Sequence, residues 1–346
     1  MENFKIRSRA PLRLGLGGGG TDMESFFNQH GGAVLNATID LYAFCCLETK
    51  KNGKIKFIAS DLAEVYECTT TNFIETNGKL ILHKAIYNHF VKNFNNNIPF
   101  DHEITTYCDV PAGSGLGSSS TLVVSIIKAY SEFLGLSFGD YDIANLAYQI
   151  ERVELGMKGG KQDQYAASFG GFNFMEFYEN NRTIINPLRI RKWIVSEFEQ
   201  SLILFNTGTS RFSSSIIKDQ DKLISEKSSK TITSMLDIKQ EAINIKEYLL
   251  KGDFLKIAES IQKGWVAKKN ASNSITNNFL DKIYENVMDA GAMAGKISGA
   301  GGGGFFMFLV KPERKMDILK ILEKENGKIY PCHFVEDGVN SWTIKY

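Results

Sequence analysis

The sequence predicts a mixed α/β protein of two domains, and three observations support this fold class. The chain has 346 residues, 43% of them hydrophobic, which is enough for two cores at roughly 100–200 residues per domain. Strand-like segments rich in β-branched and aromatic residues dominate the first third, and helical periodicity is frequent afterwards. A hydrophobic strand over 201–205 follows a polar stretch, so we place the domains at residues 1–197 and 198–346.

The individual elements follow from periodicity and from glycine, asparagine and proline at their ends. Strands are predicted over 5–14, 33–47, 54–59 and 103–110. Apolar residues three and four apart predict helices over 82–90, 122–133 and 143–150. In the second domain the same patterns predict helices over 232–250, 253–268 and 277–290, a strand over 305–310, a helix after Pro312, and strands over 329–335 and 341–345.

Charge and cysteine content exclude several classes of protein. The net charge is +1, with 40 basic and 39 acidic residues, so neither nucleic acid nor a membrane surface is an expected partner. The N-terminus lacks an apolar signal core, and no apolar run approaches the roughly 20 residues of a membrane span. Five cysteines without CxxC spacing argue against a zinc site and a disulfide framework. We therefore expect a cytoplasmic protein.

The first of three glycine-rich loops, residues 15–20, follows a predicted strand and fits G-x-G-x-x-G. Asp40 lies at about the spacing at which dinucleotide folds hold a ribose. A run with five glycines fits this pattern almost automatically, and a strand-rich region follows in place of regular βα alternation. A dinucleotide-dependent oxidoreductase is therefore a distant alternative.

The second loop, VPAGSGLGSSSTL at residues 110–122, joins a predicted strand to a predicted helix. Backbone amides at a helix N-terminus bind phosphate, and serine hydroxyls suit Mg²⁺, so we interpret this loop as a nucleotide-phosphate site. It is not a Walker A loop, because Gly117 is followed by serines and no lysine. The simpler alternative is a serine cap after a glycine turn.

The third loop, SGAGGGG at residues 298–304, precedes the predicted strand over 305–310. Because each glycine costs conformational entropy, four in a row imply close approach to a ligand or to another backbone segment. A plain hairpin connection is the alternative.

Together the three loops resemble the motifs of the GHMP kinases, named after galacto-, homoserine, mevalonate and phosphomevalonate kinases. The matching segments are APLRLGLGGGGTD at 10–22, PAGSGLGSSS at 111–120 and SGAGGGG at 298–304, in the family's order. The resemblance implies ATP, Mg²⁺ and phosphoryl transfer to a small-molecule hydroxyl. It also implies a strand-rich α/β N-terminal domain and a ferredoxin-like α/β C-terminal domain, with the active site between them.

The resemblance further implies roles for particular residues. Asp163, in the GG-x-x-D-Q segment, resembles the family's catalytic aspartate, and Lys161 would neutralise charge beside it. Glu151, a glutamate followed by arginine, resembles the Mg²⁺ ligand, with Ser119 as its hydroxyl partner. The expected nucleotide-binding residues are Pro111, Gly113, Ser114, Gly115, Leu116, Gly117, Ser118, Ser119 and Ser120.

Three segments carry a narrower resemblance: RSRAPLRLGLGGGGTD at 7–22, IERVELGMKGGKQDQYAASFGGFNFMEF at 150–177 and NTGTSR at 206–211. Together they resemble the sugar kinases and, within them, the kinases of D-glycero-D-manno-heptose 7-phosphate. This implies phosphorylation of the anomeric hydroxyl of a sugar phosphate, and L-fucokinases and other sugar 1-kinases are alternatives. A non-catalytic sugar sensor is a more distant one, and the assembly stays open between a monomer and a homodimer. The expected substrate residues are Arg13, Gly19, Gly20, Thr21, Asp22, Asp40, Thr209, Arg211, Gly301 and Gly302, with Arg13, Arg211 and Lys161 as candidates for the sugar phosphate.

Overall fold

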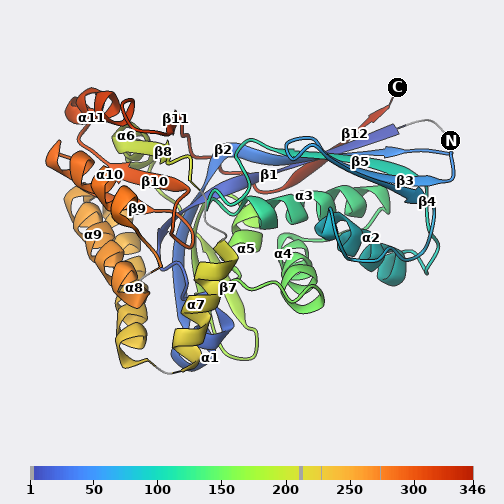
Figure 1. Cartoon of the computed structure of the whole chain (residues 1–346), viewed down its shortest axis with the longest axis horizontal. Coiled ribbons are helices and arrows are strands. Elements are labelled where there is room, and N and C mark those ends of the chain that lie inside the picture. Colours follow the sequence, from blue (N-terminus) through green and yellow to red (C-terminus); the bar gives the residue numbers. More distant parts are fainter. Residues whose placement is uncertain (1–3, 210–212, 227, 273, 346) are drawn as a thin grey trace.

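The computed structural model describes residues 4–209, 213–226, 228–272 and 274–345, so the predicted substrate residue Arg211 lies outside the described residues. The described chain forms two β-sheets with helices packed against them (Figure 1). The mixed α/β class predicted from the sequence is confirmed.

The first sheet has the order β12-β1-β2-β5-β3-β4, and β6 and β7 continue from β2. All these strands pair antiparallel except β3 with β5. The strands are β1 (Phe4–Gly17), β2 (Gly32–Thr49), β3 (Lys54–Ala59), β4 (Glu64–Thr69), β5 (His102–Cys108), β6 (Phe172–Phe177), β7 (Thr183–Pro187) and β12 (Asn340–Lys345). The antiparallel β1–β2 pair around the first glycine loop excludes a parallel βαβ dinucleotide unit, so that alternative is wrong.

Helices α2, α3 and α4 lie on one face of this sheet (Figure 1). Apolar residues of α2 and α3 pack there on Ile6, Leu47 and Ile104 of the strands and form a continuous core. The helices of this half are α1 (Glu24–His30), α2 (Ile81–Phe94), α3 (Ser118–Phe133), α4 (Asp140–Tyr148), a π-helix (Gln149–Glu154) and α5 (Gln162–Phe169).

The second sheet has the order β11-β8-β10-β9, and all neighbouring strands are antiparallel. Its strands are β8 (Leu202–Asn206), β9 (Ala294–Ile297), β10 (Phe305–Leu309) and β11 (Lys328–Tyr330). The helices are α6 (Lys192–Ser201), α7 (Ser213–Ser225), α8 (Ser229–Lys251), α9 (Phe254–Ala271), α10 (Asn278–Asp289), a 3-10 turn (Pro312–Arg314) and α11 (Lys315–Leu322). Helices α8 and α9 pack along each other, and both contact β1, the strand that leads into the first glycine loop.

The sequence prediction lacks α1, β4, α5, β6, β7, α7 and β9, and three further details differ. The polar stretch before β8 is helix α6, because Ile194 and Phe198 on one of its faces are buried in the core. The predicted strand over 329–335 ends at Tyr330. The last strand, β12, pairs with β1, so residues 340–345 join the first sheet although the prediction assigns them to the second domain. Strand pairing between distant segments is not visible in local periodicity. The boundary near residue 198 stays a prediction.

Candidate active site

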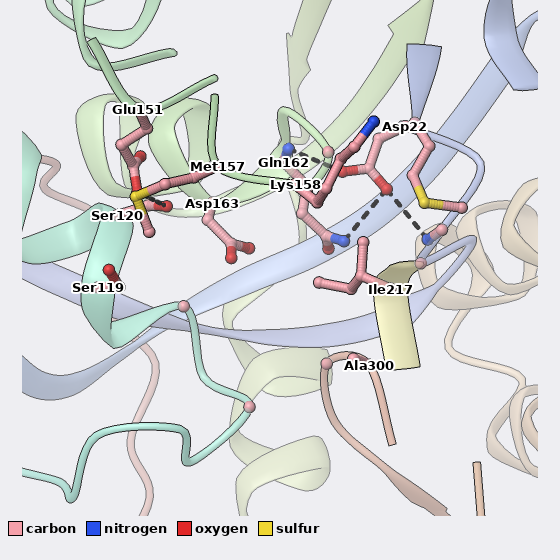
Figure 2. A pocket seen from close by; sticks show the side chains of 18 of the residues that line it. Asp22, Ser119, Ser120, Glu151, Met157, Lys158, Gln162, Asp163, Ile217 and Ala300 are labelled. Atoms are coloured by element: carbon pink, nitrogen blue, oxygen red, sulfur yellow. Dashed lines mark hydrogen bonds between the residues drawn. The ribbon is translucent and has the colours of Figure 1, made fainter. Parts of the chain in front are cut away.

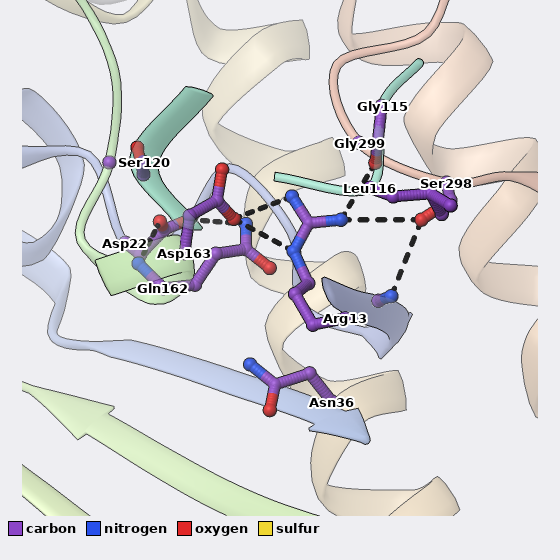
Figure 3. A network of polar contacts seen from close by, with 12 residues as sticks. Arg13, Asp22, Asn36, Gly115, Leu116, Ser120, Gln162, Asp163, Ser298 and Gly299 are labelled. Atoms are coloured by element: carbon purple, nitrogen blue, oxygen red, sulfur yellow. Dashed lines mark hydrogen bonds and ion pairs between the residues drawn. The ribbon is translucent and has the colours of Figure 1, made fainter. Parts of the chain in front are cut away.

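The predicted catalytic aspartate forms a buried ion pair with Arg13. Asp163 lies in the first turn of α5, and Arg13 comes from β1. The guanidinium Nε and Nη2 lie 2.7 and 2.6 Å from the same oxygen, Asp163 Oδ1 (Figure 3). The Arg13 side chain is 4% exposed and that of Asp163 is 22% exposed, because one side of the aspartate faces the cavity. Both guanidinium contacts are on Oδ1, so the geometry directs Oδ2 to other partners.

The remaining donors of Arg13 hold two glycine loops together. Its Nη1 donates to the Gly115 carbonyl at 2.7 Å and to Ser298 Oγ at 3.3 Å. The guanidinium therefore joins β1, the second loop, the third loop and α5 (Figure 3). Arg13 was one of three candidates for the sugar phosphate. Because its guanidinium donors are occupied by Asp163 and these loops, the geometry favours a role in orienting Asp163.

Asp22 forms the opposite wall of the same cavity and is buried. Its Oδ1 accepts from the Gly20 amide at 3.0 Å and from Gln162 Nε2 at 3.3 Å, and its Oδ2 accepts from the Gln162 amide at 3.0 Å. Burial raises the pKa of Asp22 and the nearby Asp163 carboxylate raises it further, whereas the backbone hydrogen bonds lower it. The sequence analysis missed Gln162, although it directly precedes Asp163 in the motif.

Glu151 lies in the π-helix that extends α4, and it is fully buried at the other end of the cavity. Its Oε1 accepts from Ser120 Oγ at 3.0 Å, and its Oε2 accepts from Gln164 Nε2 at 2.6 Å. Burial raises the pKa of Glu151, and Arg152, with Nη1 at 3.7 Å, partly opposes this shift. The hydroxyl beside the carboxylate is thus Ser120, not the predicted Ser119, which is exposed and lies apart from it (Figure 2).

Three consecutive residues of α5 connect the polar groups of the cavity. Gln162 contacts Asp22, Asp163 pairs with Arg13, and Gln164 contacts Glu151. Successive side chains on a helix point about 100° apart, since a turn takes 3.6 residues. The first turn of α5 therefore directs Gln162 toward Asp22, Asp163 toward the middle of the cavity and Gln164 toward Glu151.

The glycines of the second and third loops allow backbone segments to approach each other. A Cβ on Gly115 would lie 2.5 Å from the Ser298 carbonyl oxygen, and one on Gly304 would lie 2.3 Å from the Ser114 carbonyl oxygen. Both residues have positive φ, +81° and +85°. A Cβ on Gly117 would lie 3.0 Å from Asp163 Cγ, so this glycine lets the aspartate reach the loop.

The tetraglycine contributes less to the cavity than predicted. Gly301 and Gly302 pack on Ile275, whose carbonyl accepts from the Gly302 amide at 2.7 Å. The preceding residues Gly299 and Ala300 line the cavity instead. Of the two explanations for the glycines, close approach to another backbone segment is therefore the one that applies at Gly301 and Gly302.

Lys161 points away from the cavity, contrary to its predicted catalytic role. Its ammonium donates to the Asn181 side chain and lies 5.0 Å from the Phe27 ring and 4.9 Å from the Tyr148 ring. Burial lowers its pKa to about 8. The lysine precedes α5, whose first turn directs the residues after it, but not Lys161 itself, into the site.

Three further predicted substrate residues have structural partners outside the cavity. The hydroxyl of Thr21 lies between the Gly18 and Ala33 carbonyls, at 2.8 and 2.9 Å, and holds the first loop. The Asp40 carboxylate accepts from the amide of residue 333 at 2.9 Å. Thr209 lies beside the third loop, where its carbonyl accepts from the Gly304 amide. Asp40 and Thr209 thus form contacts between distant segments, which sequence spacing does not reveal.

The cavity brings together most of the remaining predicted residues (Figure 2). The predicted residues that line it are Arg13, Gly19, Gly20, Asp22, Gly113, Gly115, Gly117, Ser118, Ser119, Ser120, Glu151 and Asp163. Pro111, Ser114 and Leu116 support the loop without lining this cavity. The lining residues that the sequence analysis missed are Met23, Arg152, Met157, Lys158, Gly159, Gly160, Gln162, Ile217, Gln220, Lys268, Gly299 and Ala300.

A second hollow adjoins the first at Ser118 and Ser119 and is mainly apolar. Its walls include Leu62, Leu80, Leu82, Val110 and Leu122. A flat, apolar group bound here would be continuous with the serines of the second loop.

Helix α3 begins directly at the second loop, with Gly117 as its N-cap. This glycine has no side chain that could accept from the first-turn amides, so those amides are available to a phosphate. Among the described residues, no group of three or more acidic, histidine or cysteine side chains is placed to hold a metal ion. The candidate metal ligands are thus one carboxylate and one hydroxyl, a donor set that suits Mg²⁺ when phosphate oxygens and water complete the shell.

Comparisons with known proteins give matches in both halves of the chain. The family model for the GHMP kinases N terminal domain matches residues 81–171, and the model for the GHMP kinases C terminal domain matches residues 245–328. A Campylobacter jejuni protein named D-glycero-alpha-D-manno-heptose 7-phosphate kinase is 47% identical, over 98% of this chain and 99% of that relative. The L-fucokinase/L-fucose-1-P guanylyltransferase of Bacteroides fragilis is 25% identical, over 96% of this chain and 37% of that relative.

Two solved structures of sugar kinases are similar to this chain over nearly its whole length. The crystal structure of a D-glycero-D-manno-heptose 1-phosphate kinase from Bacteroides thetaiotaomicron superposes with a TM-score of 0.84 and 42% identity, covering 99% of this chain and all of the other. That of a putative sugar kinase from Campylobacter jejuni superposes with a TM-score of 0.81 and 45% identity, covering 98% of each chain. No helix among the described residues is long and apolar enough to cross a membrane.

Proposed function

The chain belongs to the GHMP kinase family, and we propose that it transfers a phosphoryl group from ATP to the anomeric hydroxyl of D-glycero-D-manno-heptose 7-phosphate. The product would be the 1,7-bisphosphate. The relative from Campylobacter jejuni, named for the 7-phosphate substrate, supports this choice, and so does the heptose kinase structure. The name of that structure refers to a 1-phosphate, so the position of phosphorylation is part of the proposal.

The observation that carries the proposal is the position of Asp163 between two other carboxylates. Asp22 and its partner Gln162 lie on one side, and Glu151 with Ser120 lies on the other. Carboxylates and amides hold sugar hydroxyls well, whereas a carboxylate with a hydroxyl suits a nucleotide-bound cation. A sugar at Asp22 and a nucleotide at Ser120 would meet at Asp163.

We assign nucleotide binding to the second loop. The free amides at the start of α3 would hold phosphate oxygens, and the hollow lined by Leu80, Val110 and Leu122 would hold the base. Glu151 and Ser120 would hold Mg²⁺, which neutralises charge on the phosphates when bound. This arrangement would replace the lysine that a Walker A loop supplies.

On the acceptor side, Asp163 would orient the sugar hydroxyl and accept its proton. Arg13 contacts only Oδ1, so Oδ2 is the oxygen that would accept a hydrogen bond from the hydroxyl. Because phosphoryl transfer has a loose transition state, correct positioning supplies most of the rate acceleration. Arg13 would contribute by holding the carboxylate in one orientation.

A coupled ATPase assay tests the proposal with heptose 7-phosphate, heptose 1-phosphate, unphosphorylated heptose, fucose, galactose and mannose, and with mevalonate as the control acceptor. We expect the highest kcat/KM with heptose 7-phosphate and, by ³¹P NMR, a new phosphate on the anomeric carbon. A clear preference for fucose or another free sugar would replace the proposal with the sugar 1-kinase alternative. Sugar binding with no turnover on any acceptor would favour the sensor.

A further inference from the structure

Lys268 of α9 places a buried ammonium group at the cavity. Its side chain reaches in from the second half of the molecule, and the residue is 6% exposed. The ammonium donates to the Gly299 carbonyl, and no carboxylate of the described residues lies within ion-pairing distance of it. A buried charge without a counter-charge is costly, so an ammonium kept at a cavity wall indicates an anionic ligand.

Lys268 lies near charges of both signs. Burial lowers the pKa of Lys268 to about 8; the Arg13 guanidinium also lowers it, and the Asp22 carboxylate raises it. Lys296 of β9 lies near enough for Lys268 to lower its pKa, and the Lys296 ammonium binds the Gly15 carbonyl at 2.7 Å. Because Asp163 is already paired with Arg13, it is not free to balance the Lys268 ammonium, and Asp22 is the carboxylate whose charge acts on Lys268.

Gln220 of α7 lies at the same edge of the cavity, against the first glycine loop. It is 3% exposed, and its Nε2 has the Met235 sulfur, a weak acceptor, as its partner at 3.2 Å. A Cβ on Gly20 would lie 3.3 Å from Gln220 Nε2, and a Cβ on Gly19 would lie 3.9 Å from Lys268 Nζ. The two side chains thus face neighbouring glycines, and Gly20 donates directly to Asp22.

The position of Lys268 and Gln220 in the cavity indicates which anion would bind. Glu151 and Ser120, the candidate metal ligands, lie at the opposite end of the cavity from Asp22 (Figure 2). The corner of Lys268 and Gln220 adjoins Asp22, on the sugar side of Asp163. Lys158 also lines the cavity, but it is half-exposed and already paired with Asp221 at 3.1 Å.

We propose that Lys268 and Gln220 form the subsite for the phosphate group that the sugar substrate already carries, a proposal that rests on the sugar phosphate kinase function above. Lys268 supplies the charge and Gln220 an amide donor, while Asp22 holds the adjoining sugar hydroxyls. The glycines at 19 and 20 leave the room that the phosphate needs. This subsite selects phosphorylated over unphosphorylated sugars.

Calorimetry on the full-length protein without ATP tests the subsite with two ligand pairs, heptose 7-phosphate with heptose and mannose 6-phosphate with mannose. We expect Lys268→Met to raise the Kd of heptose 7-phosphate by about 10- to 100-fold, the value of a lost charge-assisted hydrogen bond. The Kd of heptose and of Mg-ATP should change by less than about threefold, within the range of remote substitutions. Gln220→Leu should act in the same direction, by about fivefold.

Lys263→Met is the matched control, since Lys263 lies on the same helix and is exposed. The ligand-free melting temperature of Lys268→Met should equal or exceed that of the wild type, because the variant removes an unpaired buried charge. A lysine needed only to anchor Gly299 would instead give a lower melting temperature and equal losses for both members of each pair. That result would overturn the subsite. So would a loss of Mg-ATP affinity in Lys268→Met, or a selective loss of heptose 7-phosphate affinity in Lys158→Met but not in Lys268→Met.

Failure of the subsite and failure of the proposed function are distinguishable. If the wild type turns over heptose 7-phosphate and heptose equally, the kinase function stands and the subsite is wrong. If the wild type turns over no heptose but binds mannose 6-phosphate more tightly than mannose, and Lys268→Met removes that difference, the subsite stands and the assigned sugar is wrong.

Discussion

Replacing Asp163 with asparagine separates the chemistry of the site from its architecture. Asparagine has nearly the same shape, so its carbonyl oxygen can keep both contacts with Arg13. Its amide nitrogen then takes the position of Oδ2, where it donates and cannot accept a proton. We expect turnover to fall by at least about 10²–10⁴-fold, the usual contribution of a general base.

The same substitution should also weaken the fold, because it leaves a charged guanidinium that is only 4% exposed. Breaking a fully buried pair costs about 3–5 kcal/mol; since Asp163 is 22% exposed and two hydrogen bonds remain, we expect about 1–3 kcal/mol. Asp317→Asn is the control, because its partner Arg314 is 55% exposed and the pair should contribute less than about 1 kcal/mol.

A coupled kinase assay measures turnover, calorimetry measures Mg-ATP binding, and differential scanning fluorimetry measures stability. Mg-ATP affinity should stay within about threefold of the wild type, because the nucleotide contacts are assigned to the second loop. Turnover within tenfold of the wild type would refute the role of Asp163. A melting temperature no lower than that of Asp317→Asn would refute the contribution of the buried pair to stability.

The remaining predictions concern three other parts of the site. Because burial raises the pKa of Glu151, its ionised form destabilises the metal-free fold. Glu151→Gln should therefore have a higher melting temperature than the wild type near neutral pH. This difference should shrink as the pH falls and vanish below about 4.5, where the wild-type carboxyl group is protonated in both the folded and the unfolded state. The same variant should need more Mg²⁺, and an unchanged metal titration would remove Glu151 from the site. Gly115→Ala should lower the melting temperature more than Gly53→Ala. Both glycines have positive φ, where a side chain costs about 1–2 kcal/mol, but only a Cβ on Gly115 would meet a carbonyl oxygen, at 2.5 Å. Equal losses of melting temperature would contradict the contact between the loops. Lys161→Met should retain far more turnover than Asp163→Asn, since its ammonium points away from the cavity; an equal loss in the kinase assay would restore Lys161 to the catalytic centre.

The sequence predicted most helices and strands because their signals are local. Helix α3 and strand β10 are examples, with a strong helical period in one and a continuous apolar run in the other. Helix α6 was missed because Ile194 and Phe198 are the only buried apolar residues of a polar segment. The return of β12 to β1 depends on a pairing across more than 300 residues, which no local pattern encodes.

Within the site, the sequence identified the carboxylates but not their partners. Asp22, Glu151 and Asp163 all line the cavity, as their motifs predicted. The choice between Ser119 and Ser120 could not be made, because it depends on the rotation of α3 relative to Glu151. The direction of Lys161 likewise depends on how α5 begins.

By itself, the sequence determined the fold class, the three glycine loops, their order and the family that they resemble. These features reside in residue types at short spacings, where backbone sterics and hydrogen bonding act locally. The tertiary structure alone decided that Arg13 pairs with Asp163 and that the glycines serve backbone contact between loops. It alone brought Lys268 to the same cavity as Asp22, although the two residues are 246 positions apart in the chain. Such contacts depend on how distant elements pack, and charge, burial and distance at the site are properties of that packing.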